Sequence, residues 1–183
     1  NISLFIETKN PKVSYNDLII PIKNIKMYLN FVSVIKSKAR INQINIETKE
    51  INIDQFKKIL IRTKPSNLNS FIINKVESGV LTANFELFFE NNIKLKDFIV
   101  KGKVKNMNAT VNDEIKIKNS YFEFFSDKTD TIIKKIGADV SGISISDGSL
   151  RVEKEKNINI ESDFVTKISI NKKNSNLYSK YLQ

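Results

Sequence analysis

The feature that most constrains this chain is a recurring alternation of apolar and polar residues whose parity changes partway along each run. In the stretch ISISDGSLRV, Ile143 and Ile145 are odd-numbered, whereas Leu150 and Val152 are even-numbered. The same change of parity occurs in four further stretches, 19–29, 39–48, 93–102 and 114–125. Alternation with a period of two is typical of β-strands that have one apolar and one polar face. The sequence therefore predicts a chain built mainly from strands.

Two backbone structures explain a change of parity within such a run. A two-residue hairpin reverses the chain, and Asp-Gly is a favoured pair for its type I′ turn, so we expect a turn at Asp147-Gly148 that pairs Ile145 with Leu150. A turn is also favoured at Asn119-Ser120. The alternative is a β-bulge, which kinks a continuous strand. Because β-branched and aromatic residues resist a positive φ, the sequence favours bulges, while leaving turns open, at Asn24-Ile25, Gln43-Ile44 and Asp97-Phe98.

Helical spacing interrupts the strands in two places. Apolar residues three and four positions apart predict one or two helical turns over 31–35. A pair of helices is expected near residues 54–76, because Pro65 ends the first helix and Ser66 can cap the second. Gly79 lies just beyond the expected end of the second helix.

The predicted fold class is mainly β: an elongated, curved antiparallel sheet, or half-open β-groove, with the short helical pair at 54–76. We divide the chain into an N-terminal β segment with a short helix (1–53), the helical pair (54–79), repeated antiparallel strands (80–170) and a polar tail or start of the next segment (171–183). The repeated strands are expected at 80–90, 93–105, 109–118, 121–126, 131–140, 143–153 and 158–170, with a short helix over 132–136 left open. Because the sequence does not begin with Met, we expect a single structural domain excised from a larger protein.

Composition argues against several classes of function. The chain has 183 residues with no Cys and no His, which removes disulfides, thiol chemistry, the commonest zinc ligand and every Ser-His triad. We therefore predict no enzymatic activity, no metal site and no cofactor. The remaining candidate acids for a hydrolase fall mostly in or near expected turns, where carboxylates are common for local hydrogen-bonding reasons: Asp97, Asp113, Glu114, Asp127, Asp130 and Asp147.

The net charge of +10 does not by itself indicate nucleic-acid binding. Arg occurs only three times among 30 basic residues, and the lysines are scattered along the strands, whereas base recognition depends on Arg and phosphate binding on a focused patch. The abundance of Ile, Asn and Lys instead indicates an AT-rich genome. The densest basic cluster fits the solvated face of an amphipathic helix, with membrane-surface or nucleic-acid binding as the alternative: Lys57, Lys58, Arg62 and Lys64.

The order of these elements resembles that of AsmA/TamB-like proteins. The resemblance covers roughly residues 3 to 170 and rests on Asn-Pro-Lys at 10–12, FVSVIKSK at 31–38, the strand at 39–53, the helical pair and the strands of the type I-x-I-x-D-G-x-L-x-V. It implies a large bacterial envelope protein, similar in architecture to bridge-like lipid transfer proteins. Such a protein is anchored in the inner membrane by an N-terminal segment that this sequence lacks, crosses the periplasm and reaches an outer-membrane partner.

The resemblance also implies an apolar β-groove that carries phospholipid acyl chains between the inner and outer membranes or for envelope maintenance. Shielding matters because exposure of an acyl chain to water costs about 0.8 kcal/mol per CH₂. The alternative is a closed β-rich structural or adhesion module, in which the same side chains form a dry core. The residues expected to line the groove are Ile22, Met27, Ile41, Ile46, Leu95, Val100, Ile117, Phe122, Phe124, Ile145, Leu150 and Val152.

Overall fold

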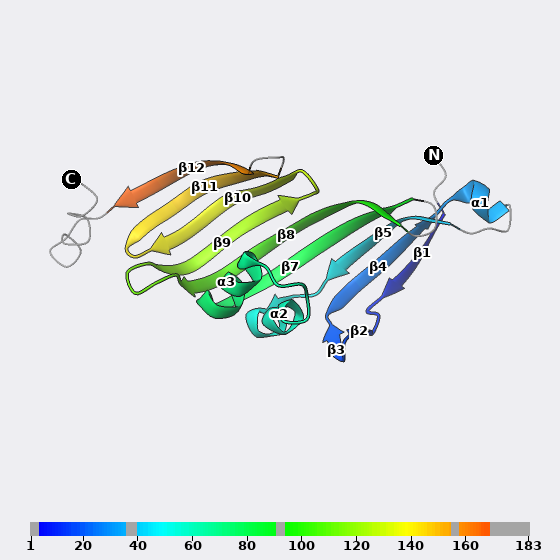
Figure 1. Ribbon diagram of the computed structural model, residues 1–183, viewed down its shortest axis with the longest axis horizontal. Coiled ribbons are helices and arrows are strands. Elements are labelled where there is room, and N and C mark those ends of the chain that lie inside the picture. The colour runs from blue at the N-terminus through cyan, green and yellow to red at the C-terminus, as the bar shows by residue number, and fades with distance from the viewer. Residues whose placement is uncertain (1–3, 36–39, 91–93, 155–157, 169–183) are drawn as a thin grey trace.

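The chain forms one large antiparallel sheet in the computed structural model (Figure 1). The structure describes residues 4–35, 40–90, 94–154 and 158–168. Within these ranges the sheet has 10 strands in the order β1-β4-β5-β7-β8-β9-β10-β11-β12, with β6 pairing with β7 beside this path. The strands are β1 (Leu4–Lys9), β4 (Ile22–Leu29), β5 (Ile41–Thr48), β6 (Ile51–Asn52), β7 (Val76–Phe89), β8 (Leu95–Thr110), β9 (Lys116–Ser126), β10 (Asp130–Val140), β11 (Ile143–Lys154) and β12 (Ile158–Ile168).

The sheet is open and curved, and β1 and β12 form its two edges. A separate hairpin of β2 (Val13–Tyr15) and β3 (Leu18–Ile20) stands beside β4. Its turn residues Asn16 and Asp17 have φ values of 47° and 61°, as a type I′ turn requires. The predicted fold class, a mainly β, elongated and curved antiparallel sheet with few short helices, is confirmed.

Three helices interrupt the described strands, and all lie where the sequence predicts them. They are α1 (Phe31–Ile35), α2 (Ile53–Leu60) and α3 (Asn67–Lys75). The side chain of Ser66 caps α3 by accepting a hydrogen bond from the backbone N–H of Asn69 (3.1 Å). Gly79, however, does not end this helix. The chain passes directly from α3 into β7, and Gly79 lies within that strand.

The expected hairpin at Asp147-Gly148 is wrong. The strand β11 continues through this pair, with Ile145 opposite Ala138 of β10 and Leu150 opposite Ile133. The register of β11 with β12 shifts between Ile145 and Asp147, so the change of parity is a bulge. A turn here would break the pairing of β11 with both of its neighbouring strands. This long-range pairing outweighs the local preference of Asp-Gly for a type I′ turn.

The turn favoured at Asn119-Ser120 is wrong for the same reason, because β9 runs through it. Asn119 has a φ of 51°, and Asn106, in the expected gap between two strands, has a φ of 52° within the continuous strand β8. Asn tolerates this backbone conformation better than most residues do. The short helix left open over 132–136 is likewise absent, since β10 is extended there.

The bulges favoured in the remaining three stretches are confirmed as register shifts. In each case one strand has an extra residue, and this residue immediately precedes the predicted pair. The extra residues are Lys23, Asn42 and Lys96. The sequence therefore located these irregularities to within one position.

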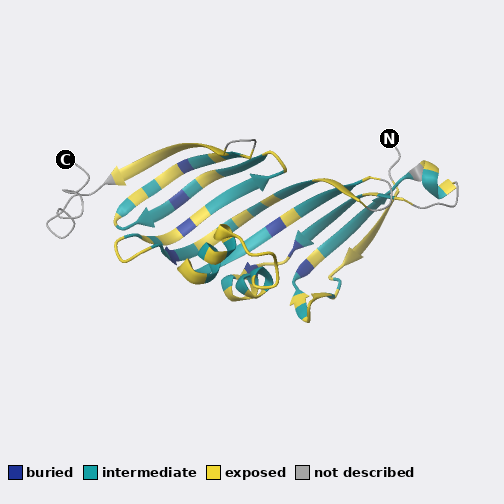
Figure 2. Ribbon diagram, viewed as in Figure 1, coloured by how far each residue is buried: buried dark blue, intermediate teal, exposed yellow. Residues whose placement is uncertain are grey.

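The chain buries few side chains. The buried apolar residues are Ile22, Ile51, Val76, Ala83 and Ala109, and no large side chain among the described residues is completely buried (Figure 2). The helices α2 and α3 pack against β7 and α2 also against β6, so the buried cluster lies largely around them. Most of the sheet is therefore a single uncovered layer.

Candidate functional site

The apolar side chains of neighbouring strands lie on one face of the sheet, here called the apolar face. Residues directly opposite each other in an antiparallel pair project to the same side. Following these pairs from strand to strand defines a row that crosses the entire sheet. It consists of Thr8, Ile25, Ile46, Phe85, Val100, Ser126, Thr131, Val152 and Ile160. Its polar residues are Thr8 at one edge and the pair Ser126 and Thr131, whose hydroxyl groups are hydrogen-bonded to each other (2.8 Å). Lys154 Nζ also donates to Ser126 Oγ (2.8 Å).

The register places every residue predicted to line the groove on the apolar face. Phe124, for example, lies opposite Gly102 and Ile133, and Ile133 lies opposite Leu150. The residues brought together in this way are Ile22, Met27, Ile41, Ile46, Leu95, Val100, Ile117, Phe122, Phe124, Ile145, Leu150 and Val152. That this face binds lipid stays a prediction.

The bulges keep these residues on one side. Ile145 and Leu150 are an odd number of positions apart, so a regular strand would project them to opposite faces. The irregularity between Ile145 and Asp147 restores both to the apolar face. Asn119 does the same in β9, where Ile117 precedes the bulge and Phe122 follows it.

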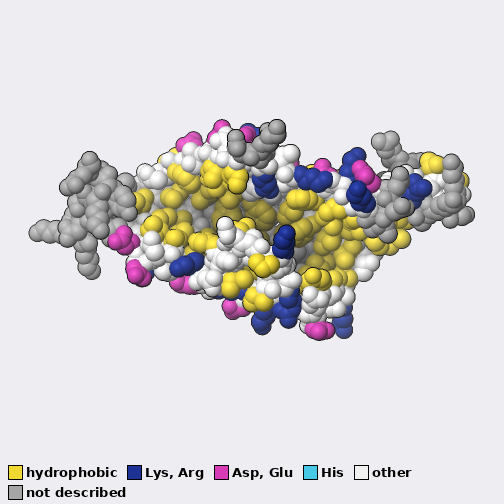
Figure 3. Space-filling model, in the orientation of Figure 1, with side chains coloured by type: hydrophobic (Ala, Val, Ile, Leu, Met, Phe, Trp, Pro, Cys, Tyr) yellow, Lys and Arg dark blue, Asp and Glu magenta, His cyan; other side chains and the backbone are white. Residues whose placement is uncertain are grey.

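The apolar face is only partly covered. Figure 3 shows hydrophobic side chains gathered along it on both sides of the helical pair, with the surface hollowed between them. Most of the predicted lining residues are half-buried, among them Met27, Val100 and Leu150. The extremes are Ile22, which is buried, and Leu95, which is 47% exposed near one end of its strand. Within the described residues no second sheet packs against this face.

Sequence reasoning missed several large residues of the same face. Phe85, Leu87, Phe98 and Ile133 all lie opposite residues of the apolar face. For Phe85 and Leu87 the identifying signal is simple alternation without a change of parity, as in ANFELFF at 83–89. A search restricted to parity changes overlooks such regular runs.

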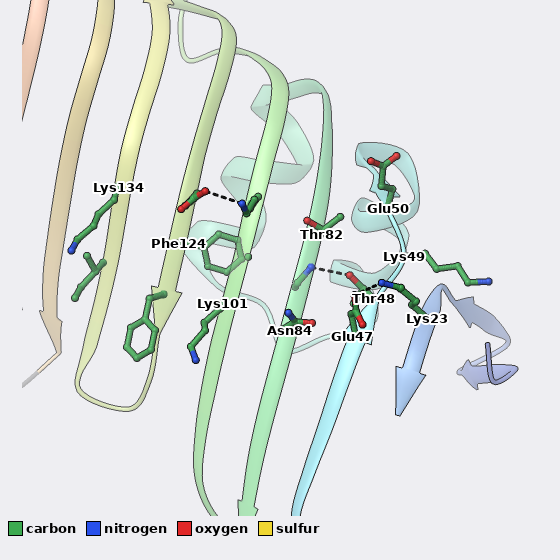
Figure 4. A pocket seen from close by; sticks show the side chains of 16 residues that line it. Lys23, Glu47, Thr48, Lys49, Glu50, Thr82, Asn84, Lys101, Phe124 and Lys134 are labelled. Atoms are coloured by element: carbon green, nitrogen blue, oxygen red, sulfur yellow. Dashed lines mark hydrogen bonds and ion pairs between the residues drawn. The ribbon is translucent and has the colours of Figure 1, made fainter. Parts of the chain in front are cut away.

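The opposite, polar face has its own hollow of about 830 Å³ near the middle of the sheet (Figure 4). Lysine and glutamate side chains line it and form ion pairs, including Lys23 with Glu47 (2.6 Å) and Lys103 with Glu123 (2.9 Å). Hydrogen bonds from Lys103 and then Lys135 lower the pKa of Glu123 below its usual value. Exposed pairs of this kind stabilise a fold little and form no nucleophile–base arrangement.

Two of the candidate carboxylates, Asp127 and Asp97, form hydrogen bonds within their own local structure. Asp127 accepts hydrogen bonds from the backbone N–H groups of Thr129 and Asp130 (both 2.8 Å) at the turn between β9 and β10. The carboxylate of Asp97 accepts from the N–H of Phe98 (2.8 Å). In the described ranges no three acidic residues gather as a metal site would require.

Searches against family models, curated proteins and solved structures found no match to this chain. In the described part of the chain no helix is long and apolar enough to span a membrane.

Proposed function

We propose that this chain binds phospholipid acyl chains on the apolar face, as a non-catalytic segment of an AsmA/TamB-like protein. In this proposal the larger protein is anchored in the inner membrane through an N-terminal segment, crosses the periplasm, and carries lipid toward an outer-membrane partner or maintains the envelope. The observation that carries the proposal is the largely apolar face that extends from strand to strand, with no second sheet over it among the described residues.

The energetics favour an apolar ligand on this face. Apolar surface removed from water is worth about 25 cal/mol per Å², so an uncovered apolar sheet and an acyl chain each gain from contact. Large contiguous apolar areas on a protein surface mark interaction sites. An open trough also permits release, because the ligand keeps one side accessible along the whole path.

A closed structural or adhesion module is the second reading of the sequence. A β-sandwich interdigitates two sheets at close-packed density. Within the described residues the only other sheet is the two-stranded hairpin of β2 and β3, which is too small to cover the apolar face. This observation favours the lipid-binding reading over the dry core.

Native mass spectrometry of the purified chain, followed by organic extraction, tests the proposal. We expect phospholipid to co-purify with the wild type. Val100→Asp introduces a charge into the apolar row and should abolish the co-purification of phospholipid. Ile99→Asp is the matched control, because Ile99 is the adjacent half-buried residue of β8 and projects to the polar face opposite Glu86.

Circular dichroism and thermal melting must show that both variants remain folded. Lipid retained by Ile99→Asp and lost from Val100→Asp would support the apolar face as the binding site. A wild-type chain that carries no lipid and ignores added phospholipid would contradict the proposal, as would equal loss from both variants.

A further inference from the structure

A second surface carries large apolar side chains that the described structure leaves uncovered. It consists of the C-terminal end of α2, the loop to α3, the first turn of α3 and the β2–β3 hairpin, and we call it the helix–hairpin surface. Ile61 and Leu68 are each 66% exposed, Ile19 is 75% exposed and Tyr15 is 52% exposed. Isolated apolar residues on a surface need no explanation, but a group of them bordered by charge marks an interaction site.

Hydrogen bonds hold this surface together. Arg62 Nε, at the end of α2, donates to the carbonyl oxygen of Asn16 in the hairpin turn (3.0 Å). Asn69 Nδ2, in α3, donates to Thr63 Oγ1 and to the carbonyl oxygen of Lys64 (3.0 Å each). The exposed apolar residues Ile61, Leu68 and Tyr15 are each next in sequence to one of these bonded residues, so their backbone is held in place.

The charge of the surface is strongly positive. No acidic residue occurs between Asp54 and Glu77, and the basic residues of this interval that belong to the surface are Lys57, Lys58, Arg62 and Lys64. None of the three lysines has an ion pair among the described residues. Asp17 in the hairpin turn is the acidic residue of the surface. In Figure 3 hydrophobic side chains show on the helical pair, with Lys and Arg side chains along its lower edge.

We propose that the helix–hairpin surface docks onto an anionic lipid bilayer. Apolar residues bordered by lysines match the headgroup boundary, where the apolar side chains enter and the ammonium groups meet lipid phosphates. The inference goes beyond acyl-chain binding, since it names a different surface and a different partner. Because α2 and α3 also pack against the sheet, docking would bring the apolar face beside the membrane that exchanges lipid with it.

Vesicle co-sedimentation of the 183-residue chain tests this docking. We expect binding to vesicles that contain phosphatidylglycerol, weaker binding to phosphatidylcholine alone, and a steep fall with added salt. Replacing both Ile61 and Leu68 by Ser should abolish binding. Lys57→Gln and Lys64→Gln should each weaken binding about fivefold.

Matched controls distinguish binding by this surface from nonspecific binding through other exposed apolar or basic residues. Ile158→Ser with Val165→Ser removes apolar residues of similar exposure, 75% and 60%, at the far edge strand. Lys96→Gln and Lys105→Gln, made singly, each remove one positive charge from the sheet. These controls should bind vesicles like the wild type, and all variants should melt like it.

Three results would overturn the proposal: no binding of the wild type to anionic vesicles at low salt, equal binding to uncharged vesicles, or equal losses in the control variants. Val100→Asp distinguishes the two proposals. It should lose co-purifying lipid and keep vesicle binding, so failure of acyl-chain binding would leave docking intact. If an acidic protein binds this surface while anionic vesicles do not, docking onto a bilayer is wrong.

Discussion

At the scale of single residues, glycines determine where aromatic rings lie on the sheet. A Cβ atom on Gly102 would come within 2.5 Å of Phe124 Cζ, and one on Gly148 would collide with the ring of Phe164. Each ring lies over the glycine of the neighbouring strand and occupies the space that a side chain at that position would need. Gly148 in the stretch ISISDGSLRV therefore serves as space for Phe164 and does not serve a turn.

We predict that Gly148→Ala lowers the free energy of unfolding by about 1–3 kcal/mol, because overpacking displaces the ring of Phe164. In a Phe164→Ala background the same substitution should cost much less. Urea unfolding of the two single variants and the double variant measures this coupling. Equal costs of Gly148→Ala in both backgrounds would show that the ring does not occupy the glycine's space.

A second prediction at this scale concerns pH. Hydrogen bonds from the backbone N–H groups of Asp130 and Thr129 lower the pKa of Asp127 below its usual value. A carboxylate with a lowered pKa stabilises the fold above its unfolded pKa, about 3.9, and this contribution is lost as pH falls through the lowered value. We expect the Asp127 carboxyl to titrate by NMR with a midpoint below 3.9.

The variant Asp127→Asn keeps an acceptor oxygen but removes the titration. Its unfolding free energy should fall less than that of the wild type between about pH 6 and about pH 3. Asp113→Asn, in the preceding turn between strands, controls for the general effect of removing one negative charge. A midpoint at the ordinary value would show that the hydrogen bonds of this turn do not stabilise the Asp127 carboxylate.

At the scale of elements, the bulges of neighbouring strands lie beside one another. Register shifts adjoin residues 76–80 in β7, 104–109 in β8, 134–139 in β10 and 145–147 in β11, with Asn119 between them in β9. Two of the parity changes in the sequence, at Asn119 and next to Asp147, therefore belong to one line of irregularities across these strands, which is consistent with the curvature of the sheet.

The sequence predicted two of these positions, Asp147-Gly148 and Asn119-Ser120, but misassigned both as turns. Asp-Gly and Asn-Ser satisfy the local chemistry of a turn, and nothing local reveals that β11 has partners on both sides. The helices were predictable for the opposite reason, because Pro65 and the Ser66 cap act within a few residues. Helix ends are predictable because they depend on residues a few positions away. Strand pairing is less predictable because it depends on residues far away in the sequence.

Deleting Ser146 tests the role of the bulge. The deletion would move Ile143 and Ile145 to the polar face or break their register with β10. We expect a loss of at least about 2 kcal/mol in unfolding free energy, from exposure of half-buried isoleucines. Ser146→Ala keeps the residue count and should cost little. A deletion no worse than this substitution would show that the bulge does not set the face.

At the scale of the whole molecule, the alternation predicted the apolar face and the open sheet, but not the exposed edges. The edge strand β12 carries Ile158, Ile160 and Val165 with 60% or more of each residue exposed. Such an edge pairs readily with another strand. A residue's place on an edge depends on which strands pair, and the sequence pattern of β12 is the same as that of an interior strand.

We predict that the chain associates through β12 in a defined register. Antiparallel pairing of two copies about Phe164 keeps both apolar faces on one side and sets Glu161 of one copy opposite Lys167 of the other, because positions equidistant from the centre pair. Glu161→Lys should therefore reduce the association constant in sedimentation velocity, since it places like charges opposite each other. The exchange Glu161→Lys with Lys167→Glu restores opposite charges and should restore association. If the exchanged variant associates no better than Glu161→Lys alone, the copies do not meet in this register, and if neither variant differs from the wild type, β12 is not where they meet.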